Sequence, residues 1–370
     1  MSLTLAPEHV RAIAPYQPGK PIDELAREFG LDPAGIIKLA SNENPLGCSE
    51  RVREALGEAA GRLQGRYPDP NGFDLKADLA ARHGVPAAWI TLGNGSNDLL
   101  ELASLALLDE GASAVYAEHA FAVYRLSTQA RGARHVLVPA RDYGHDLAAM
   151  LEAIAEDTRL VFIANPNNPT GTHLPPAQVK AFLDAVRDRH GERVAVLLDE
   201  AYDEYLDPEE RVDSARWVQE YPNLIVTRTF SKAYGLAGLR VGYALAQPGL
   251  TDLLNRVRQP FNVNVLAQLA ARVALADTDF LARTYTLNRA GRIQLQDAFA
   301  QLGLDYVPSH TNFVLVRVGE AARVHGELLR RGIIVRPVAG DGLPQHLRVS
   351  IGLPEENARF IQALADILGS

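Results

Sequence analysis

Short apolar runs alternate with helix-forming windows between about residues 88 and 246, and this alternation constrains the fold more than any other feature. Short apolar runs are typical of strands buried on both faces, as in parallel sheets covered by helices. The predicted strands are Ile90–Leu92, Ala114–Tyr116, His135–Val138, Leu160–Ala164, Val194–Leu198, Leu224–Val226 and Val241–Ala244. The sequence therefore predicts an α/β fold with a large, mostly parallel sheet of seven strands.

Polar residues that could take part in catalysis or ligand binding follow three of these strands. The Asn165–Gly171 turn follows the fourth strand, Asp199 follows the fifth, and Lys232 lies a few residues beyond the sixth. Asn168 and Asp199 are 31 residues apart and Asp199 and Lys232 are 33 apart, so each step fits one βαβ unit. Ligands bind at the carboxyl ends of parallel strands, and we therefore expect these side chains to meet in one site.

These residues belong to a series of motifs spread along the chain. The motifs are Tyr16–Pro21, Ser41–Gly47, Arg66–Asp69, Gly93–Ser96, Asn165–Gly171, Asp199–Tyr202, Ser231–Lys232 and Leu347–Ser350. In this order and spacing, the chain resembles the fold-type I aminotransferases, which use pyridoxal 5′-phosphate (PLP), and among them the histidinol-phosphate aminotransferases. The resemblance covers essentially the whole chain and implies the fold-type I architecture, with a large PLP-binding domain and a smaller α/β domain.

The resemblance gives several residues roles around the PLP ring. It implies that Lys232 forms the imine with PLP and moves the proton of the substrate, and that Asp199 keeps the ring nitrogen protonated. Asn168 and Tyr202 would contact the phenolic oxygen of the ring, and the ring of Phe121 would stack on its face. The segment before Phe121 departs from the family pattern, which usually begins with a proline and a small hydroxyl residue.

A phosphate group needs converging donors, and the amino end of a helix supplies several. The predicted phosphate contacts are Gly95, Ser96, Thr229, Ser231 and Arg240, with Tyr67 reaching in from a second subunit. This last contact implies a homodimer. The Gly93–Gly95 pair alone would also suit a dinucleotide fold, but the third glycine and the acidic residue of that motif do not follow.

Substrate contacts are expected from Arg336, Arg348, Tyr16 and Asn44. A guanidinium grips a carboxylate or a phosphate with two hydrogen bonds, and in this family Arg348 would hold the acidic group of the substrate. The function implied by the resemblance is transfer of the amino group of L-histidinol phosphate to 2-oxoglutarate. The products would be imidazole acetol phosphate and L-glutamate, a step of histidine biosynthesis.

Other functions stay open at this point. An aromatic amino-acid aminotransferase acting on phenylalanine or tyrosine is the alternative within the same chemistry, and a threonine-phosphate decarboxylase is a more distant one. A non-catalytic PLP-domain binding protein and a nicotinamide oxidoreductase belong to different classes. A net charge of −8 without clustered basic residues argues against a nucleic-acid surface.

The 370 residues exceed the size at which a single core usually keeps growing, so more than one domain is expected. We predict an N-terminal arm at 1–40 that includes part of the small domain, a large PLP-binding domain at 41–255, and a small domain at 256–370. Five prolines in the first forty residues disfavour any regular element there. The single cysteine, and the lack of a signal peptide or of an apolar stretch long enough for a membrane, predict a cytoplasmic protein without a membrane partner.

Overall fold

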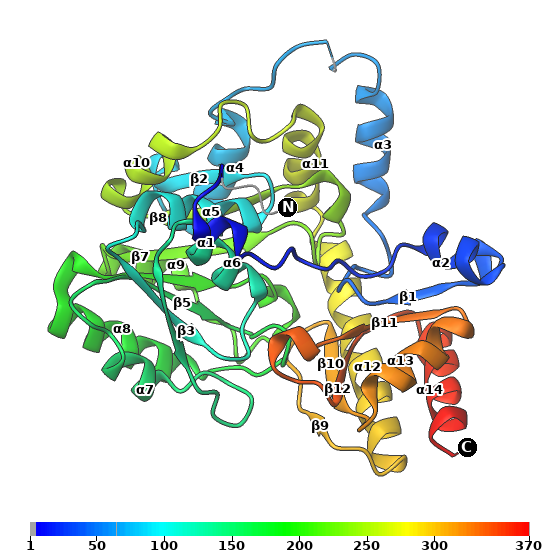
Figure 1. Cartoon of the computed structure of the whole chain (residues 1–370). Helices are drawn as coiled ribbons and strands as arrows, with labels where there is room; N and C mark the ends of the chain where they lie inside the picture. Colours follow the sequence, from blue (N-terminus) through cyan, green and yellow to red (C-terminus); the bar gives the residue numbers. More distant parts are fainter. Residues whose placement is uncertain (1–4, 64, 370) are drawn as a thin grey trace.

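The strands of the computed structural model, which describes residues 5–63 and 65–369, form two separate sheets. The larger sheet has the strand order β2-β8-β7-β6-β5-β3-β4, and the smaller has the order β1-β11-β12-β10-β9. Figure 1 shows the larger sheet on the left, with α3 at the upper right, and the smaller sheet at the lower right. The α/β architecture predicted from the sequence is confirmed.

All seven predicted strands overlap strands of the larger sheet. These strands are β2 (Ile90–Gly93), β3 (Ser113–Ala117), β4 (Arg134–Val138), β5 (Thr158–Ala164), β6 (Ala195–Asp199), β7 (Leu224–Thr229) and β8 (Gly242–Ala246). Only β8 runs against its neighbours, so the sheet is mostly parallel, as predicted. The carboxyl ends of β5, β6 and β7 therefore lie along one edge.

The apolar character of β6 has a direct cause, because both of its faces are covered. Val196 and Leu198 pack into one core, and Ala195 and Leu197 pack into a second core on the opposite face. The helices packed around this sheet are α3 (Glu50–Ala59), α4 (Phe73–His83), α5 (Ser96–Leu107), α6 (Ala122–Ala130), α7 (Leu147–Glu152), α8 (Pro176–His190), α9 (Ser214–Glu220), α10 (Pro248–Val257) and α11 (Val265–Ala276). Short 3-10 helices are η1 (Pro33–Gly35), η2 (Ala87–Trp89), η3 (Gly191–Arg193), η4 (Asp203–Tyr205), η5 (Ala237–Leu239) and η6 (Ala339–Asp341).

The smaller sheet is built mainly from the C-terminal part of the chain. Its strands are β1 (Ile37–Leu39), β9 (Tyr306–Val307), β10 (Phe313–Arg317), β11 (Ile333–Pro337) and β12 (His346–Ser350), and it packs with α12 (Thr278–Gln301), α13 (Ala321–Arg330) and α14 (Pro354–Leu368). Across residues 5–63 and 65–369, we find no helix with both the length and the apolar character that crossing a membrane requires.

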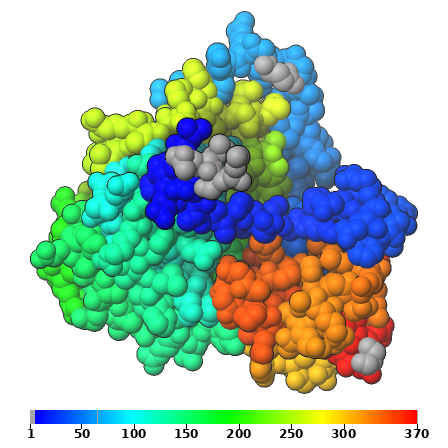
Figure 2. All heavy atoms as spheres, in the orientation of Figure 1, coloured from blue at the N-terminus to red at the C-terminus, as the bar shows by residue number. Residues whose placement is uncertain are grey.

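The N-terminal segment contains more regular structure than its prolines predict. After α1 (Glu8–Arg11), the helix α2 (Ile22–Phe29) runs for eight residues, and β1 then pairs in parallel with β11. The expectation of no regular element was wrong because Pro21 lies at the N-cap of α2, where a proline costs no hydrogen bond. Figure 2 shows this segment, in blue, running across one face along the edge of the orange C-terminal part.

The boundary between the two units can be drawn from the cores to which the helices belong. Helix α11 contributes Ala267, Ala270 and Ala271 to a core of the larger sheet, although it lies beyond residue 255. Helix α12 packs on α14 and β10, and it also contacts η4, which follows β6 of the larger sheet. We propose that the large unit runs from about residue 41 to the start of α12, and that β1 joins the C-terminal unit.

Candidate active site

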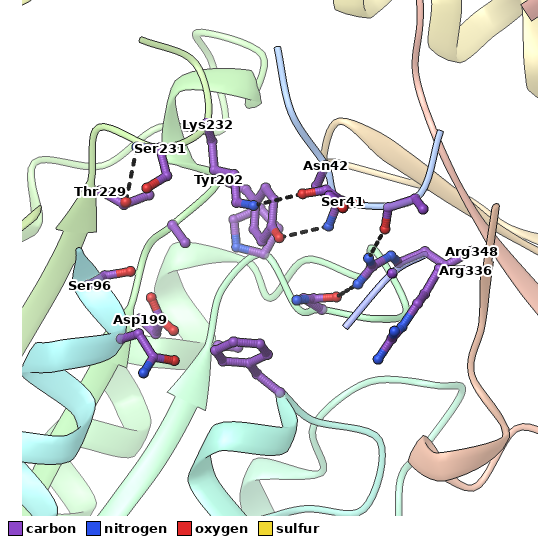
Figure 3. A pocket seen from close by; sticks show the side chains of 18 of the residues that line it. Ser41, Asn42, Ser96, Asp199, Tyr202, Thr229, Ser231, Lys232, Arg336 and Arg348 are labelled. Carbon is purple, nitrogen blue, oxygen red and sulfur yellow. Dashed lines mark hydrogen bonds between the residues drawn. The ribbon is translucent and has the colours of Figure 1, made fainter. Parts of the chain in front are cut away.

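A cavity of about 330 Å³ lies at the carboxyl ends of β5, β6 and β7, and residues of both sheets line it. It brings together most of the site residues predicted from the sequence: Tyr16, Ser96, Phe121, Asn168, Asp199, Tyr202, Thr229, Ser231, Lys232, Arg240, Arg336 and Arg348. Figure 3 shows Lys232 and Tyr202 near its centre, with Ser96 and Thr229 on one side and Arg336 and Arg348 on the other. Residues up to 332 positions apart in the sequence thus share one site.

Lys232 follows β7 and its amine faces the cavity. Nζ donates a hydrogen bond to the carbonyl oxygen of Ser41 at 3.2 Å and lies 5.8 Å from the centroid of the Tyr202 ring. Burial, followed by the guanidinium of Arg348, lowers the pKa of the amine to about 8. A larger fraction of the amine is therefore neutral near pH 7 than in an exposed lysine, and a neutral amine is the nucleophilic form.

Asp199 is the last residue of β6 and only 5% of it is exposed. Its carboxylate accepts hydrogen bonds from the hydroxyl of Tyr124 at 2.9 Å and from Oγ1 of Thr227 at 3.2 Å. Burial raises the pKa of Asp199, and these two hydrogen bonds oppose that rise. A cationic partner in the cavity would stabilise the charged carboxylate further.

Tyr202 keeps its proton at neutral pH, because burial raises its pKa to about 12. Its hydroxyl oxygen accepts a hydrogen bond from Nδ2 of Asn42 at 2.9 Å. Asn42 has a left-handed backbone (φ 56°), and its Oδ1 accepts a hydrogen bond from the hydroxyl of Ser350. The proton of the Tyr202 hydroxyl can therefore be donated to a group inside the cavity.

Hydroxyls, a guanidinium and a helix terminus form a cup at one end of the cavity. Helix α5 begins at Ser96, and Gly95 before it provides no side-chain cap. Nη1 of Arg240 lies 3.3 Å from the hydroxyl of Ser231. Gly95 does not line the cavity, but only a glycine fits at this position beside it. Its φ is 86°, and a Cβ there would lie 2.3 Å from Nη2 of Arg240. Free N–H groups and a guanidinium together suit an anion such as a phosphate.

Two guanidiniums lie together at the opposite end. Arg336 on β11 and Arg348 on β12 are paired across the strands, and the Arg336 guanidinium carbon lies 5.3 Å from the centroid of the Tyr16 ring. Arg348 donates to Oδ1 of Asn168 at 2.6 Å and to the carbonyl of Ala40, but its buried Nε has no partner. Among the described residues, no carboxylate forms an ion pair with either arginine. Such a pair is suited to bind an anionic ligand.

Two predicted contacts lie away from the cavity. Asn44 donates its amide to the carbonyl of Ala233 and to Oγ1 of Thr284, so it ties segments of the chain together. Tyr67 is 82% exposed and its ring stacks on Phe261 at 4.6 Å. Neither residue reaches the site within this chain.

The sequence analysis missed four groups at the site. Ser41 and Asn42 line the cavity, and Tyr124 and Thr227 hold Asp199. Thr227 could have been recognised in the sequence as a candidate site residue, because it is a hydroxyl residue after an apolar run. In the structure it pairs in register with Asp199. Tyr124 lies three residues after Phe121, the N-cap of α6, and this spacing does not by itself predict the contact of Tyr124 with Asp199.

Comparison with known proteins decides the family. The model of the family "Aminotransferase class I and II" matches residues 34–364. The chain belongs to the class I and II aminotransferases. A relative of this aminotransferase, "Histidinol-phosphate aminotransferase 2" of Ralstonia nicotianae, is 64% identical over 100% of the chain and 98% of the relative. "Histidinol-phosphate aminotransferase 1" of Cupriavidus pinatubonensis is also 64% identical, over 97% of the chain and 95% of that protein.

A solved structure gives the same family. The histidinol-phosphate aminotransferase of Sinorhizobium meliloti, described in complex with pyridoxal-5′-phosphate, superposes on this aminotransferase with a TM-score of 0.89 at 30% identity. The match covers 99% of this chain and 98% of that one. The resemblance drawn from the motifs, and the fold-type I architecture that it implied, are confirmed.

Proposed function

We propose that this aminotransferase, with PLP bound in the cavity, transfers the amino group of L-histidinol phosphate to 2-oxoglutarate. The products are imidazole acetol phosphate and L-glutamate, which places the reaction in histidine biosynthesis. The observation that carries the proposal is the pair Arg336 and Arg348, which faces the cavity and forms no ion pair with a carboxylate among the described residues. Relatives named histidinol-phosphate aminotransferases, at 64% identity over nearly full length, support the same substrate.

The cavity fits PLP group by group. Lys232 offers an amine to the aldehyde, Asp199 offers a buried carboxylate to the ring nitrogen, and Tyr202 offers its hydroxyl to the phenolic oxygen. Ser96, Thr229, Ser231 and Arg240 would hold the phosphate, with the ring of Phe121 on the cofactor face. The uncapped start of α5 and the side-chain-free Gly95 beside Arg240 support an anion at this end.

PLP, when bound, supplies an electron sink for the charge that develops on the substrate carbon as its proton leaves. Asp199 keeps the ring nitrogen protonated, and Tyr124 and Thr227 hold its carboxylate in one orientation. Lys232 would take the proton from the carbon of the donor that bears the amino group, and in the second half of the reaction it would deliver a proton to the corresponding carbon of the 2-oxo acid that becomes the new amine. An amine with a pKa of about 8 is well matched to this task near neutral pH.

The two arginines select the substrate. L-Histidinol phosphate carries no carboxylate, and its phosphate has a charge of about −1.5 to −2 at pH 7. Arg336 and Arg348 would bind this phosphate together, and the same guanidiniums would bind the carboxylates of 2-oxoglutarate and glutamate. Tyr16, which is half exposed beside Arg336, would cover the substrate on that side.

The active form is proposed to be a homodimer. Tyr67 lies outside the cavity of its own chain and is largely exposed, which supports a role at the phosphate of a second subunit. Asn44, by contrast, is occupied by Ala233 and Thr284, and a direct substrate contact would require these two hydrogen bonds to break.

Steady-state kinetics with two amino donors test the function. With 2-oxoglutarate as acceptor, we expect kcat/KM for L-histidinol phosphate to exceed that for L-phenylalanine by about 100-fold or more, since two charge-assisted contacts separate the donors. A preference for phenylalanine would instead identify an aromatic amino-acid aminotransferase. Absence of amino transfer from every donor, with PLP bound, would indicate a protein that only binds the cofactor.

A further inference from the structure

Three metal-binding side chains meet outside the active-site cavity. His173 follows the Asn165–Gly171 turn, Glu210 follows η4, and His310 lies in the loop before β10. One nitrogen or oxygen atom from each residue lies within 4.8 Å of those of the other two, and all three residues are partly buried. Nδ1 of His310 lies 3.1 Å from Oε2 of Glu210, and the two imidazole rings have centroids 5.2 Å apart.

We propose that His173, Glu210 and His310 form a binding site for a divalent transition metal ion, with zinc as the best match. Two imidazole nitrogens and one carboxylate oxygen form a ligand set typical of zinc, which is often held by three protein ligands and one open position. Ligand atoms about 2.0–2.1 Å from a tetrahedral zinc lie about 3.3 Å from one another. The His310–Glu210 pair already has this separation, and the remaining ligand atom needs a shift of about 1–2 Å.

The charge of the cluster suits a cation. A neutral imidazole, such as that of His173, has a free lone pair for a metal ion. Glu210 supplies the negative charge, and the carboxylate of Asp203 adds to the field at His173. A divalent ion would replace the contact between His310 and Glu210 with stronger bonds to both.

The position of the cluster gives the ion a consequence for the enzyme. His173 and Glu210 lie in loops of the larger sheet, whereas His310 leads into β10 of the smaller sheet. The backbone N–H of His310 donates to the carbonyl of Gly171 at 2.9 Å, and a Cβ on Gly171 would lie 2.7 Å from the hydroxyl of Ser309. The Asn165–Gly171 turn also carries Asn168. An ion bound here would therefore fix the turn to the loop of the smaller sheet and restrain movement between the two sheets.

Calorimetric titration of zinc chloride into chelator-treated holoenzyme tests the site. We expect Glu210→Gln and His310→Ala to weaken zinc binding at least about tenfold, because even the loss of a residue behind a ligand has effects of this size. Glu209→Gln and His190→Ala are matched controls outside the cluster and should bind zinc like the wild type. PLP itself is present in every variant, so any metal bound by the cofactor cancels in the comparison.

Thermal unfolding provides the second measurement. Zinc should raise the Tm of the wild type and of Glu209→Gln, but not that of Glu210→Gln, because a ligand that binds the folded state stabilises it. The Tm values without zinc show whether each variant is folded. Equal zinc affinity in Glu210→Gln and Glu209→Gln, or no zinc binding by the wild type, overturns the proposal.

Discussion

Replacing Arg336 with methionine removes one of the two cations proposed to bind the substrate phosphate while keeping a long apolar stem. Arg348 already uses Nη1 and Nη2 on Asn168 and Ala40, so Arg336 supplies the freer guanidinium. Two hydrogen bonds to a charged group contribute about 1.5–3 kcal/mol each, and the half-buried position favours the lower value. A loss of about 3 kcal/mol corresponds to a decrease of about 100-fold in kcat/KM for L-histidinol phosphate.

The same variant should affect phenylalanine much less, because a single carboxylate can bind Arg348 alone. We expect its kcat/KM to change less than about threefold, which is the scatter of a substitution that removes no contact. The assay measures amino transfer from each donor to 2-oxoglutarate, with Arg323→Met on the exposed side of α13 as a control. An equal loss on both donors, or a loss below about threefold on L-histidinol phosphate, would falsify the role of Arg336 in phosphate binding.

Four further predictions concern the cofactor site. Gly95→Ala should raise the Kd of PLP by about tenfold or more, because the new Cβ meets Arg240 and φ is 86°. Gly57→Ala, where a Cβ meets nothing, is the control. Equal Kd values for the two variants would contradict the close approach of Gly95 to Arg240. Covalent attachment of PLP to the apoenzyme should accelerate as pH rises, with a midpoint near 8 rather than 10.5, since burial lowers the pKa of Lys232. Stopped-flow absorbance measures the rate of attachment at each pH. A midpoint near 10 would contradict the effect of burial on the amine. In the same apoenzyme the unfolded chain binds more protons between these two pH values, so its Tm should rise across that window. Tyr67→Phe should weaken PLP binding without lowering the Tm of the apoenzyme, because the side chain is 82% exposed. A fully active monomer in sedimentation experiments would refute the contact of Tyr67 with the cofactor of a partner subunit.

The elements that the sequence predicted best are those whose burial is uniform. Strands such as β6 are covered on both faces, so they appear as unbroken apolar runs with a polar residue at the end. The helix α2 was missed because the count of prolines outweighed their positions, and Pro21 lies where it begins the helix. The number of prolines in a segment does not show whether each proline lies inside a helix or at its N-cap.

The site was predictable where a motif fixes both the residue and its direction. Asp199 is the last residue of β6 and Lys232 lies shortly after β7, so their place at the edge of the sheet follows from the topology. Asn42 and Asn44 lie two residues apart in one motif, and only the left-handed backbone of Asn42 directs its side chain to Tyr202. The hydrogen bond from Tyr124 to Asp199 depends on how α6 packs on the sheet, and sequence spacing alone does not determine this packing.

The account depends most on a covalent bond between Lys232 and PLP. Borohydride reduction of the holoenzyme, followed by proteolysis and mass spectrometry, tests this bond directly. We predict that the peptide containing Lys232 carries the added mass of the reduced cofactor and that the visible absorbance of the protein is lost. Recovery of the cofactor mass on another lysine, or of an unmodified Lys232 peptide from fully reduced protein, would contradict the account.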